Sequence, residues 1–125
     1  MFSTLLQVAA GGAIGASARY LTGVGMVRLF GLPTFPLGVI TANVLGCFVM
    51  GVLASVLALR SGAHLNPFLM TGVLGGYTTF SAFALEAVTL YQRGQGGIAV
   101  TYVLASVVLS ILALVAGAYT ARVIA

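Results

Sequence analysis

The chain has 125 residues, of which 61% are hydrophobic and only 5% are charged, and its mean hydropathy is +1.19. A soluble domain carries about 25% charged residues, so this composition excludes a water-exposed fold and indicates an all-α integral membrane protein. The net charge of +4 comes from scattered arginines, whereas a nucleic-acid groove needs clustered basic residues.

Four apolar runs are long enough for a membrane-spanning helix, which needs about 20 residues. They lie at about 2–28, 35–59, 67–91 and 97–122, joined by connections that contain breakers such as Pro33 and Gly62. The N-terminus lacks the basic region of a signal peptide, so we expect the first run to be retained. We expect one membrane domain over residues 1–125.

Small residues recur at helical spacing in the first run. Gly11 and Gly15 are four residues apart, as are Gly12 and Ala16, and such spacing lets helix backbones approach closely. The pattern does not say whether the partner helix belongs to the same subunit. Arg19, deep in this run, either extends its side chain to the membrane surface or faces an aqueous vestibule.

The arginines are balanced between the two ends of the expected helices. With a cytoplasmic N-terminus, Arg60 and Arg122 would lie inside, and Arg28 and Arg93 would lie outside. Orientation follows the imbalance of Lys and Arg between short loops, and here the imbalance is close to zero. Either another feature sets a single orientation, or the chain inserts both ways and pairs with an inverted copy of itself.

The second run contains a buried polar candidate. Asn43 lies in its middle, and polar groups inside a membrane are costly and so are functional candidates. Its amide either joins two helices by a hydrogen bond or lines a path with its N–H groups. The single Cys47 is interpreted as a small buried hydrophobe rather than a metal or redox site.

The third run is interrupted by the stretch TGVLGGYTTFSAF, Thr71–Phe83, which holds three glycines, three threonines and a serine. Gly75 and Gly76 tolerate non-helical backbone, so we predict a break near 75–79. Broken backbone persists in a membrane only when it is buried in protein or lines a polar cavity. A break exposes carbonyls on one side and N–H groups on the other, which indicates an ion-handling protein without naming the ion.

Two further sets of side chains share helix faces. Phe80 and Phe83 lie on one side, where spacing alone favours packing over ligand binding, and Glu86 follows one turn later. In the fourth run, polar side chains recur every four residues and either form a ladder of donors or bond back to their own helix. They are Tyr102, Ser106 and Ser110.

Enzyme chemistry is not supported by the residue inventory. The chain has one His, one carboxylate and one Cys, which assemble neither a catalytic set nor a metal-ligand cluster. We therefore expect a protein that is not an enzyme.

With these features together, the sequence resembles the Fluc (CrcB) family of fluoride channels. The resemblance lies in GGAIGASARY in the first run, in Asn43 followed by Gly46, and in GGYTTFSAFALE, which is similar to the family motif GG-x-TTFSTF-x-x-E. It extends over essentially the whole chain.

This resemblance implies an antiparallel, dual-topology homodimer with two pores in the bacterial inner membrane. The activity it implies is passive, fluoride-selective export of cytoplasmic fluoride, which protects the cell against fluoride toxicity. The balanced arginines agree with insertion in both orientations.

The resemblance also implies residue roles. The backbone carbonyls of Gly75 and Thr78 from both subunits would hold one structural Na⁺ at the dimer interface. The anion path would be lined by Asn43, Phe80, Phe83, Tyr102, Ser106 and Ser110. Vestibule or accessory positions would be Arg19, Ser81 and Glu86.

Two positions depart from the family pattern. Ala82 and Val39 stand where members usually have threonine, so each lacks a hydroxyl. We expect altered conduction rather than loss of function.

Two other functions remain as alternatives. A dual-topology, proton-coupled small multidrug exporter needs a membrane carboxylate, usually in the first helix, and Glu86 in the third run is the only candidate here. A small structural subunit of a larger complex would show no transport by itself.

Overall fold

The structure is a computed structural model that describes residues 1–31, 35–59 and 63–124. Pro33, Arg60 and Gly62, named above in the connections, lie outside the described residues. The described elements are α1 (Phe2–Phe30), α2 (Leu37–Leu59), a short 3₁₀ helix η1 (Ala63–Leu65), a π-helix η2 (Pro67–Leu74), α3 (Gly75–Tyr77), α4 (Phe80–Gln92) and α5 (Gly96–Ile124).

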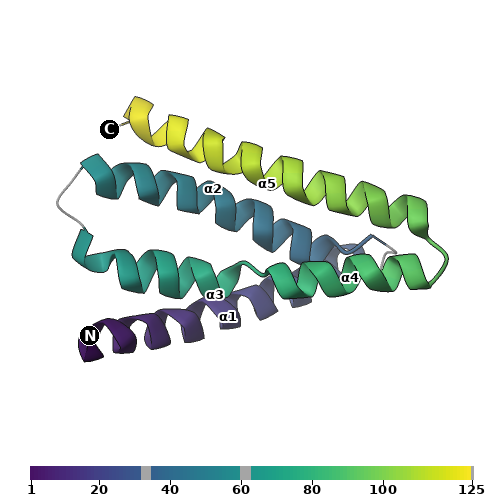
Figure 1. Cartoon of the computed structure of the whole chain (residues 1–125), viewed down its shortest axis with the longest axis horizontal. Coiled ribbons are helices and arrows are strands. Elements are labelled where there is room, and N and C mark those ends of the chain that lie inside the picture. Colours follow the sequence, from purple (N-terminus) through teal and green to yellow (C-terminus); the bar gives the residue numbers. More distant parts are fainter. Residues whose placement is uncertain (32–34, 60–62, 125) are drawn as a thin grey trace.

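The helices run alternately up and down, so that both chain termini lie at the same end of the bundle (Figure 1). Together η2, α3 and α4 form one helical rod that bends where α3 ends and α4 begins. Glycines in left-handed backbone follow two helices, Gly31 after α1 with φ 74° and Gly94 after α4 with φ 80°. The all-helical class and an interrupted third helix are therefore confirmed.

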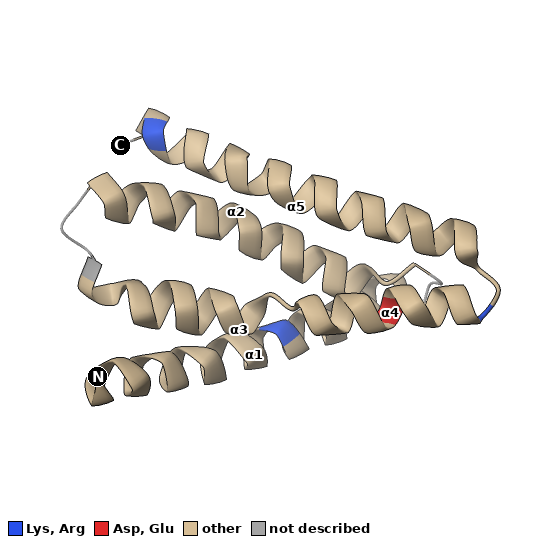
Figure 2. Ribbon diagram, viewed as in Figure 1, with Lys and Arg blue, Asp and Glu red and all other residues tan. Residues whose placement is uncertain are grey.

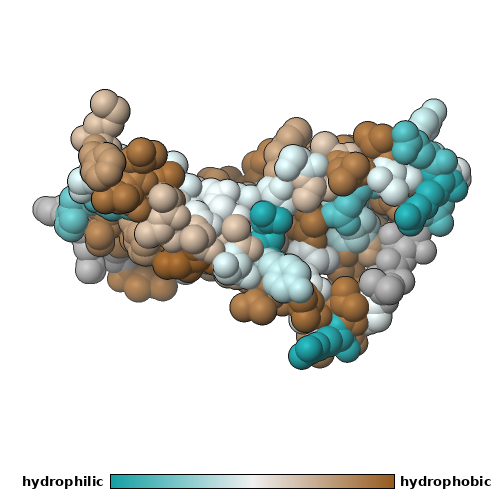
Figure 3. All heavy atoms as spheres, turned by 90° about the horizontal axis from the view of Figure 1, so that it is seen from below, coloured by the Kyte–Doolittle hydropathy of each residue, from teal (hydrophilic) through white to brown (hydrophobic). Residues whose placement is uncertain are grey.

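Three of the helical rods are long and apolar enough to cross a membrane: Leu37–Leu59, Pro67–Gln92 and Gly96–Ile124. With 29 residues α1 is also long enough, because each helical residue rises about 1.5 Å, but its polar residues make it less apolar. Brown, apolar atoms cover much of the surface in Figure 3, and hydrophilic atoms gather mainly toward one end. The chain is a multi-pass membrane protein.

Close backbone contact holds α2 along α5. A Cβ atom added to Gly117 of α5 would collide with the carbonyl of Phe48, and one added to Gly51 of α2 would collide with the carbonyl of Leu114. Because lipid chains are as apolar as the side chains, such close packing rather than the hydrophobic effect drives helix association.

A second close contact joins α1 to η2 and α3. Gly11 lies against the carbonyl of Phe68 and the Cα of Gly72, and Gly15 lies against Val73. The small residues of the first run therefore pack within the same chain. This contact is what brings the middle of α1 alongside the bend.

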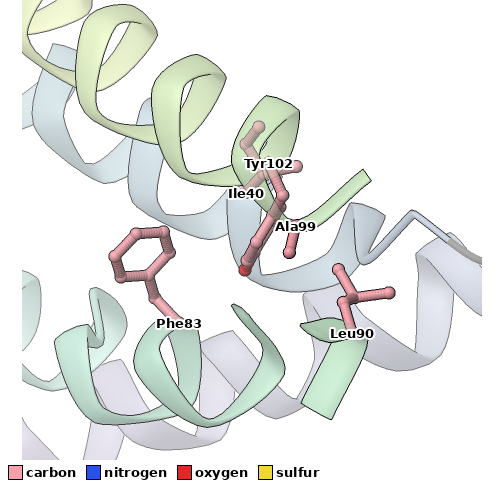
Figure 4. Close-up of a cluster of buried hydrophobic side chains, with 5 residues drawn as sticks. All are labelled: Ile40, Phe83, Leu90, Ala99 and Tyr102. Carbon is pink, nitrogen blue, oxygen red and sulfur yellow. The ribbon is translucent and has the colours of Figure 1, made fainter. Parts of the chain in front are cut away.

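The buried cluster lies between α2, α4 and α5 and includes Ile40, Phe83, Leu90, Ala99 and Tyr102 (Figure 4). The ring of Tyr102 is fully buried, and its centroid is 5.4 Å from that of Phe83. Phe83 from α4 and Tyr102 from α5 both point into the space between their helices. Aromatic stacking therefore fixes α4 against α5 just beyond the bend.

We expect Gly117→Ala to destabilise the bundle by about 1–3 kcal/mol, because the new methyl group meets backbone that cannot move aside. Thermal unfolding in detergent measures the effect. Gly97→Ala on the same helix is the matched control, since nothing lies within 4 Å of the Cβ it adds. Equal stability of the two variants would contradict close packing at Gly117.

Candidate functional site: a groove beside the helix break

The break consists of two extended residues. Thr78 has φ −84° and ψ 155°, and Thr79 has φ −149° and ψ 123°. These two residues lie within the predicted break near 75–79, whereas Gly75 and Gly76 themselves are helical and belong to α3. A Cβ atom on Gly76 would lie 2.7 Å from the carbonyl oxygen of Gly12, so Gly76 is small in order to admit α1.

Asn43 holds the extended backbone from α2. The Thr79 N–H donates to Asn43 Oδ1 at 2.7 Å, and Asn43 Nδ2 donates to the Thr79 carbonyl at 2.9 Å. The helix-joining role considered for Asn43 is thus present in the structure. An Asn amide has two N–H donors, so one remains for another partner.

This two-point contact leaves carbonyls at the end of α3 without helical partners. In a continued helix the Thr79 N–H would bond to the carbonyl of Gly75, four residues back. The Thr79 N–H instead donates to Asn43, so the Gly75 carbonyl loses its helical donor. The last carbonyls of any helix need partners from outside the helix. The carbonyl of Gly76 has one, since Arg19 Nε donates to it at 3.2 Å.

These carbonyls are the oxygen ligands that the break offers to a cation. Among the described residues, no group of three or more His, Cys, Asp or Glu side chains could hold a metal ion. Neutral backbone oxygens suit a hard cation of low charge, in contrast to the nitrogen and sulfur ligands that zinc prefers. The donor chemistry at Gly75 and Thr78 therefore fits Na⁺.

Contacts from α1 fix α3 from the other side. The hydroxyls of Thr22 and Tyr77 are 2.8 Å apart, one helical turn from the contact between Arg19 and Gly76. In Figure 2 a blue turn of α1 lies next to the bend, and the red turn on α4 marks the single acidic residue. The break is thus held by α1 and α2 together.

A groove of about 260 Å³ lies directly beside the break. Its lining brings together five of the six predicted pathway residues, with Thr78 and Thr79 at its edge: Asn43, Phe80, Phe83, Ser106 and Ser110. The sixth, Tyr102, lies against Phe83 beneath this surface. Helices α2, α4 and α5 therefore all contribute to one groove, in which a few polar groups lie among apolar side chains.

Two hydroxyl groups near the groove are buried without a protein partner. Within the described chain, neither the Ser106 nor the Tyr102 hydroxyl has a hydrogen-bond partner, although Ser106 is only 4% exposed. Thr101 and Thr120 bond back to their own helix, which Ser106 does not. Buried polar atoms almost always have a partner, so the Ser106 hydroxyl, which lines the groove, is available to a guest there.

The phenylalanines occupy different environments. Phe83 is buried at 7% exposure, whereas Phe80 is 78% exposed at the open side of the groove. Their ring centroids are 5.5 Å apart with an interplanar angle of 55°. Both rings line the groove.

A larger hollow of about 630 Å³ contains the predicted vestibule residues Arg19 and Glu86, together with Arg28. Val39, one of the departures from the family pattern, lines it as well. Ser81 is exposed, and its hydroxyl lies 3.4 Å from that of Thr79. Ser81 thus belongs to the break rather than to the hollow.

Cys47 also lines the groove. Its interpretation from the sequence, as a small buried hydrophobe, did not place it there. It is half-buried, one helical turn after Asn43. The four-residue spacing was the available signal, because it places both side chains on one helix face. The role of Thr79 in the break was also missed.

A family model described as "CrcB-like protein, Camphor Resistance (CrcB)" matches residues 6–118. The chain belongs to this family. Similar CrcB-like relatives carry the name "Fluoride-specific ion channel FluC". The protein of Cereibacter sphaeroides is 62% identical, with 98% of this chain and 97% of the relative covered. That of Paracoccus denitrificans is 54% identical at the same coverage, and that of Agrobacterium fabrum is 51% identical over 88% of this chain and 89% of the relative.

The resemblance to Fluc (CrcB) in the sequence is thereby confirmed. The relatives are named as ion channels, in agreement with the absence of an enzyme-like residue set in the sequence. Their high coverage means that the CrcB-like match includes every element that builds the groove.

Thr79→Val is expected to destabilise the protein by about 1 kcal/mol. The Thr79 hydroxyl caps α4 by accepting the N–H of Ala82 at 3.1 Å, and valine keeps the shape but not the acceptor. Thermal unfolding in detergent measures the loss. Thr79→Ser should retain the cap and most of the stability, whereas equal stability of the serine and valine variants would contradict the capping role.

Proposed function

We propose that this protein is a fluoride-specific ion channel that lets cytoplasmic fluoride leave passively through the cell membrane. The observation that carries the proposal is the 62% identity, over 98% of the chain, to a protein named as that channel. Fluoride that enters as neutral HF ionises in the cytoplasm, and a passive path lets the trapped anion leave. The protein would thereby protect the cell against fluoride toxicity.

The groove supplies what a small, strongly hydrated anion requires. A pore must replace the hydrogen bonds of water with donors of its own. Asn43 has a free amide N–H, and Ser106, Ser110 and Tyr102 carry hydroxyl donors. These donors are neutral, so they can bind the anion without trapping it.

The phenylalanines would act through the edges of their rings. An aromatic ring is positive at its edge and negative on its face, so edges turned inward favour an anion. Phe80 and Phe83 belong to α4, and they line the same groove as the donors from α2 and α5. Fluoride would pass between the ring edges and the hydroxyl ladder.

A structural Na⁺ would be held by the carbonyls of Gly75 and Thr78. When bound, it supplies a fixed positive potential that attracts anions and offsets the negative end of α3. Asn43 supports this role because it accepts the hydrogen bond of the Thr79 N–H, which would otherwise go to the Gly75 carbonyl. One chain offers too few such oxygens for a complete ligand set, so a second copy would supply the rest.

The assembly we propose is an antiparallel homodimer of four-span subunits with two pores. With α1 as the fourth span, residues 1–125 form a single membrane domain. In the sequence, Arg28 and Arg93 fall at one end of the expected helices and Arg60 and Arg122 at the other, so there is no bias that fixes a single orientation. The membrane would be the bacterial inner membrane.

Arg19 and Glu86 would shape the entrance. Both line the larger hollow, which shares no lining residue with the groove among the described residues. A cationic side chain there raises the local anion concentration. Glu86 is the residue a proton-coupled exporter would need, but the channel name of the relatives favours passive conduction.

The test is anion efflux from liposomes that hold the purified protein, followed with a fluoride electrode and repeated with chloride. We expect fast loss of fluoride and negligible loss of chloride. No fluoride flux from well-folded dimers would refute the channel, and proton-coupled transport that depends on Glu86 would then be assayed.

We expect Phe80→Ile and Phe83→Ile each to lower fluoride flux at least severalfold, because isoleucine keeps the bulk but lacks the positive ring edge. Flux is measured in the same liposome assay, with dimer assembly checked by size-exclusion chromatography. Val88→Ile on the same helix is the control, since this side chain is 53% exposed and does not line the groove. Unchanged flux in both phenylalanine variants would remove the two rings from the pathway.

A further inference from the structure

Asn43 is the one side chain of the groove that also binds both backbone groups of Thr79. We infer that Asn43 is a positioning residue for the carbonyls of the helix break, and that it couples cation binding at those carbonyls to the anion groove. The inference rests on the proposed function and deepens it. It assigns Asn43 a task beyond donating to the anion.

The coupling arises from a competition for one N–H group. The Thr79 N–H can bond to the Gly75 carbonyl and continue the helix, or bond to Asn43 and leave that carbonyl free. The structure shows the second state, with a distance of 2.7 Å to Asn43 Oδ1. A backbone N–H only donates, so it also fixes the amide orientation, with the oxygen toward Thr79 and the nitrogen toward its carbonyl.

Loss of this contact would close the break. In an apolar environment the Thr79 N–H cannot remain unpaired at low cost, and the carbonyl of Gly75 is its nearest alternative in helical geometry. The helix would extend through Thr78, and the Gly75 carbonyl would turn from the cation to the chain. Cation affinity should therefore fall when Asn43 cannot reach both groups of Thr79.

The same coupling operates from the cation side. A cation that engages the Gly75 carbonyl removes the competitor for the Thr79 N–H and so favours the contact with Asn43. That contact holds the remaining amide N–H of Asn43 at the groove. Since coupling between two binding sites is reciprocal, Na⁺ should strengthen fluoride binding by the factor by which fluoride strengthens Na⁺ binding.

The test measures how Na⁺ stabilises the purified dimer, without reference to transport. Thermal unfolding is followed at increasing Na⁺, with choline keeping the ionic strength constant, for the parent and for Asn43→Ser. Serine is too short to bind both groups of Thr79 but still offers a donor. We expect the Na⁺ concentration for half-maximal stabilisation to rise about tenfold, as the loss of a buried hydrogen bond predicts.

Ser110→Ala is the matched control, because Ser110 lines the same groove from α5 but does not bind Thr79. It should lower fluoride flux and leave the Na⁺ midpoint unchanged. An unchanged midpoint in Asn43→Ser would overturn the inference while leaving the channel proposal intact. A parent protein that conducts fluoride but shows no stabilisation by Na⁺ would refute the cation site and the coupling together.

A measurement on the parent protein decides the matter if Asn43→Ser does not fold. In a ¹⁵N-labelled sample titrated with Na⁺, the backbone amide of Thr79 and the side-chain amide of Asn43 should shift with the midpoint seen in thermal unfolding. The amide of Thr101, whose side chain bonds within α5, serves as the reference. A shift at Gly75 without one at Thr79 or Asn43 would overturn the coupling.

Discussion

The pairing of Asn43 with the backbone of Thr79 is the interaction on which the rest of the site depends. In a membrane, an unpaired backbone group costs several kcal/mol, so a helix cannot break without a replacement partner. Asn43 provides both an acceptor and a donor at Thr79, one of the two extended residues between α3 and α4. This one pairing explains the extended backbone, the free carbonyl of Gly75 and the angle of α4.

Close packing of glycines places the other supports of the break. Gly12 and Gly76 meet between α1 and α3, and this approach brings Arg19 to the carbonyl of Gly76 and Thr22 to Tyr77. In lipid, where apolar burial between helices contributes little, backbone proximity lets a few hydrogen bonds fix the geometry. The same small residues therefore serve both the fold and the site.

The sequence reveals the helices and the gathering of site residues better than it reveals the break itself. Apolar length predicts the helices, and a four-residue period places Ser106 and Ser110 on one face, which the groove contains. The exact site of extended backbone was not predictable, because Gly75 and Gly76 are equally consistent with a bend and with close packing. Only the tertiary contact with α1 distinguishes a bend from close packing, and that contact has no local sequence signal. The π-helical winding of η2 has no local sequence signal either.

Among the described residues, no charged side chain lines the groove, and the proposed channel gives this a physical reason. A cationic side chain at contact distance would bind fluoride too firmly to release it, since conduction needs sites that are favourable to enter and easy to leave. Hydroxyl and amide donors solvate the anion locally, while positive potential comes from groups set apart from the path, Arg19 in the hollow and the proposed cation at the break. Solvation and attraction are thereby separated in space, and Asn43 is where the two meet.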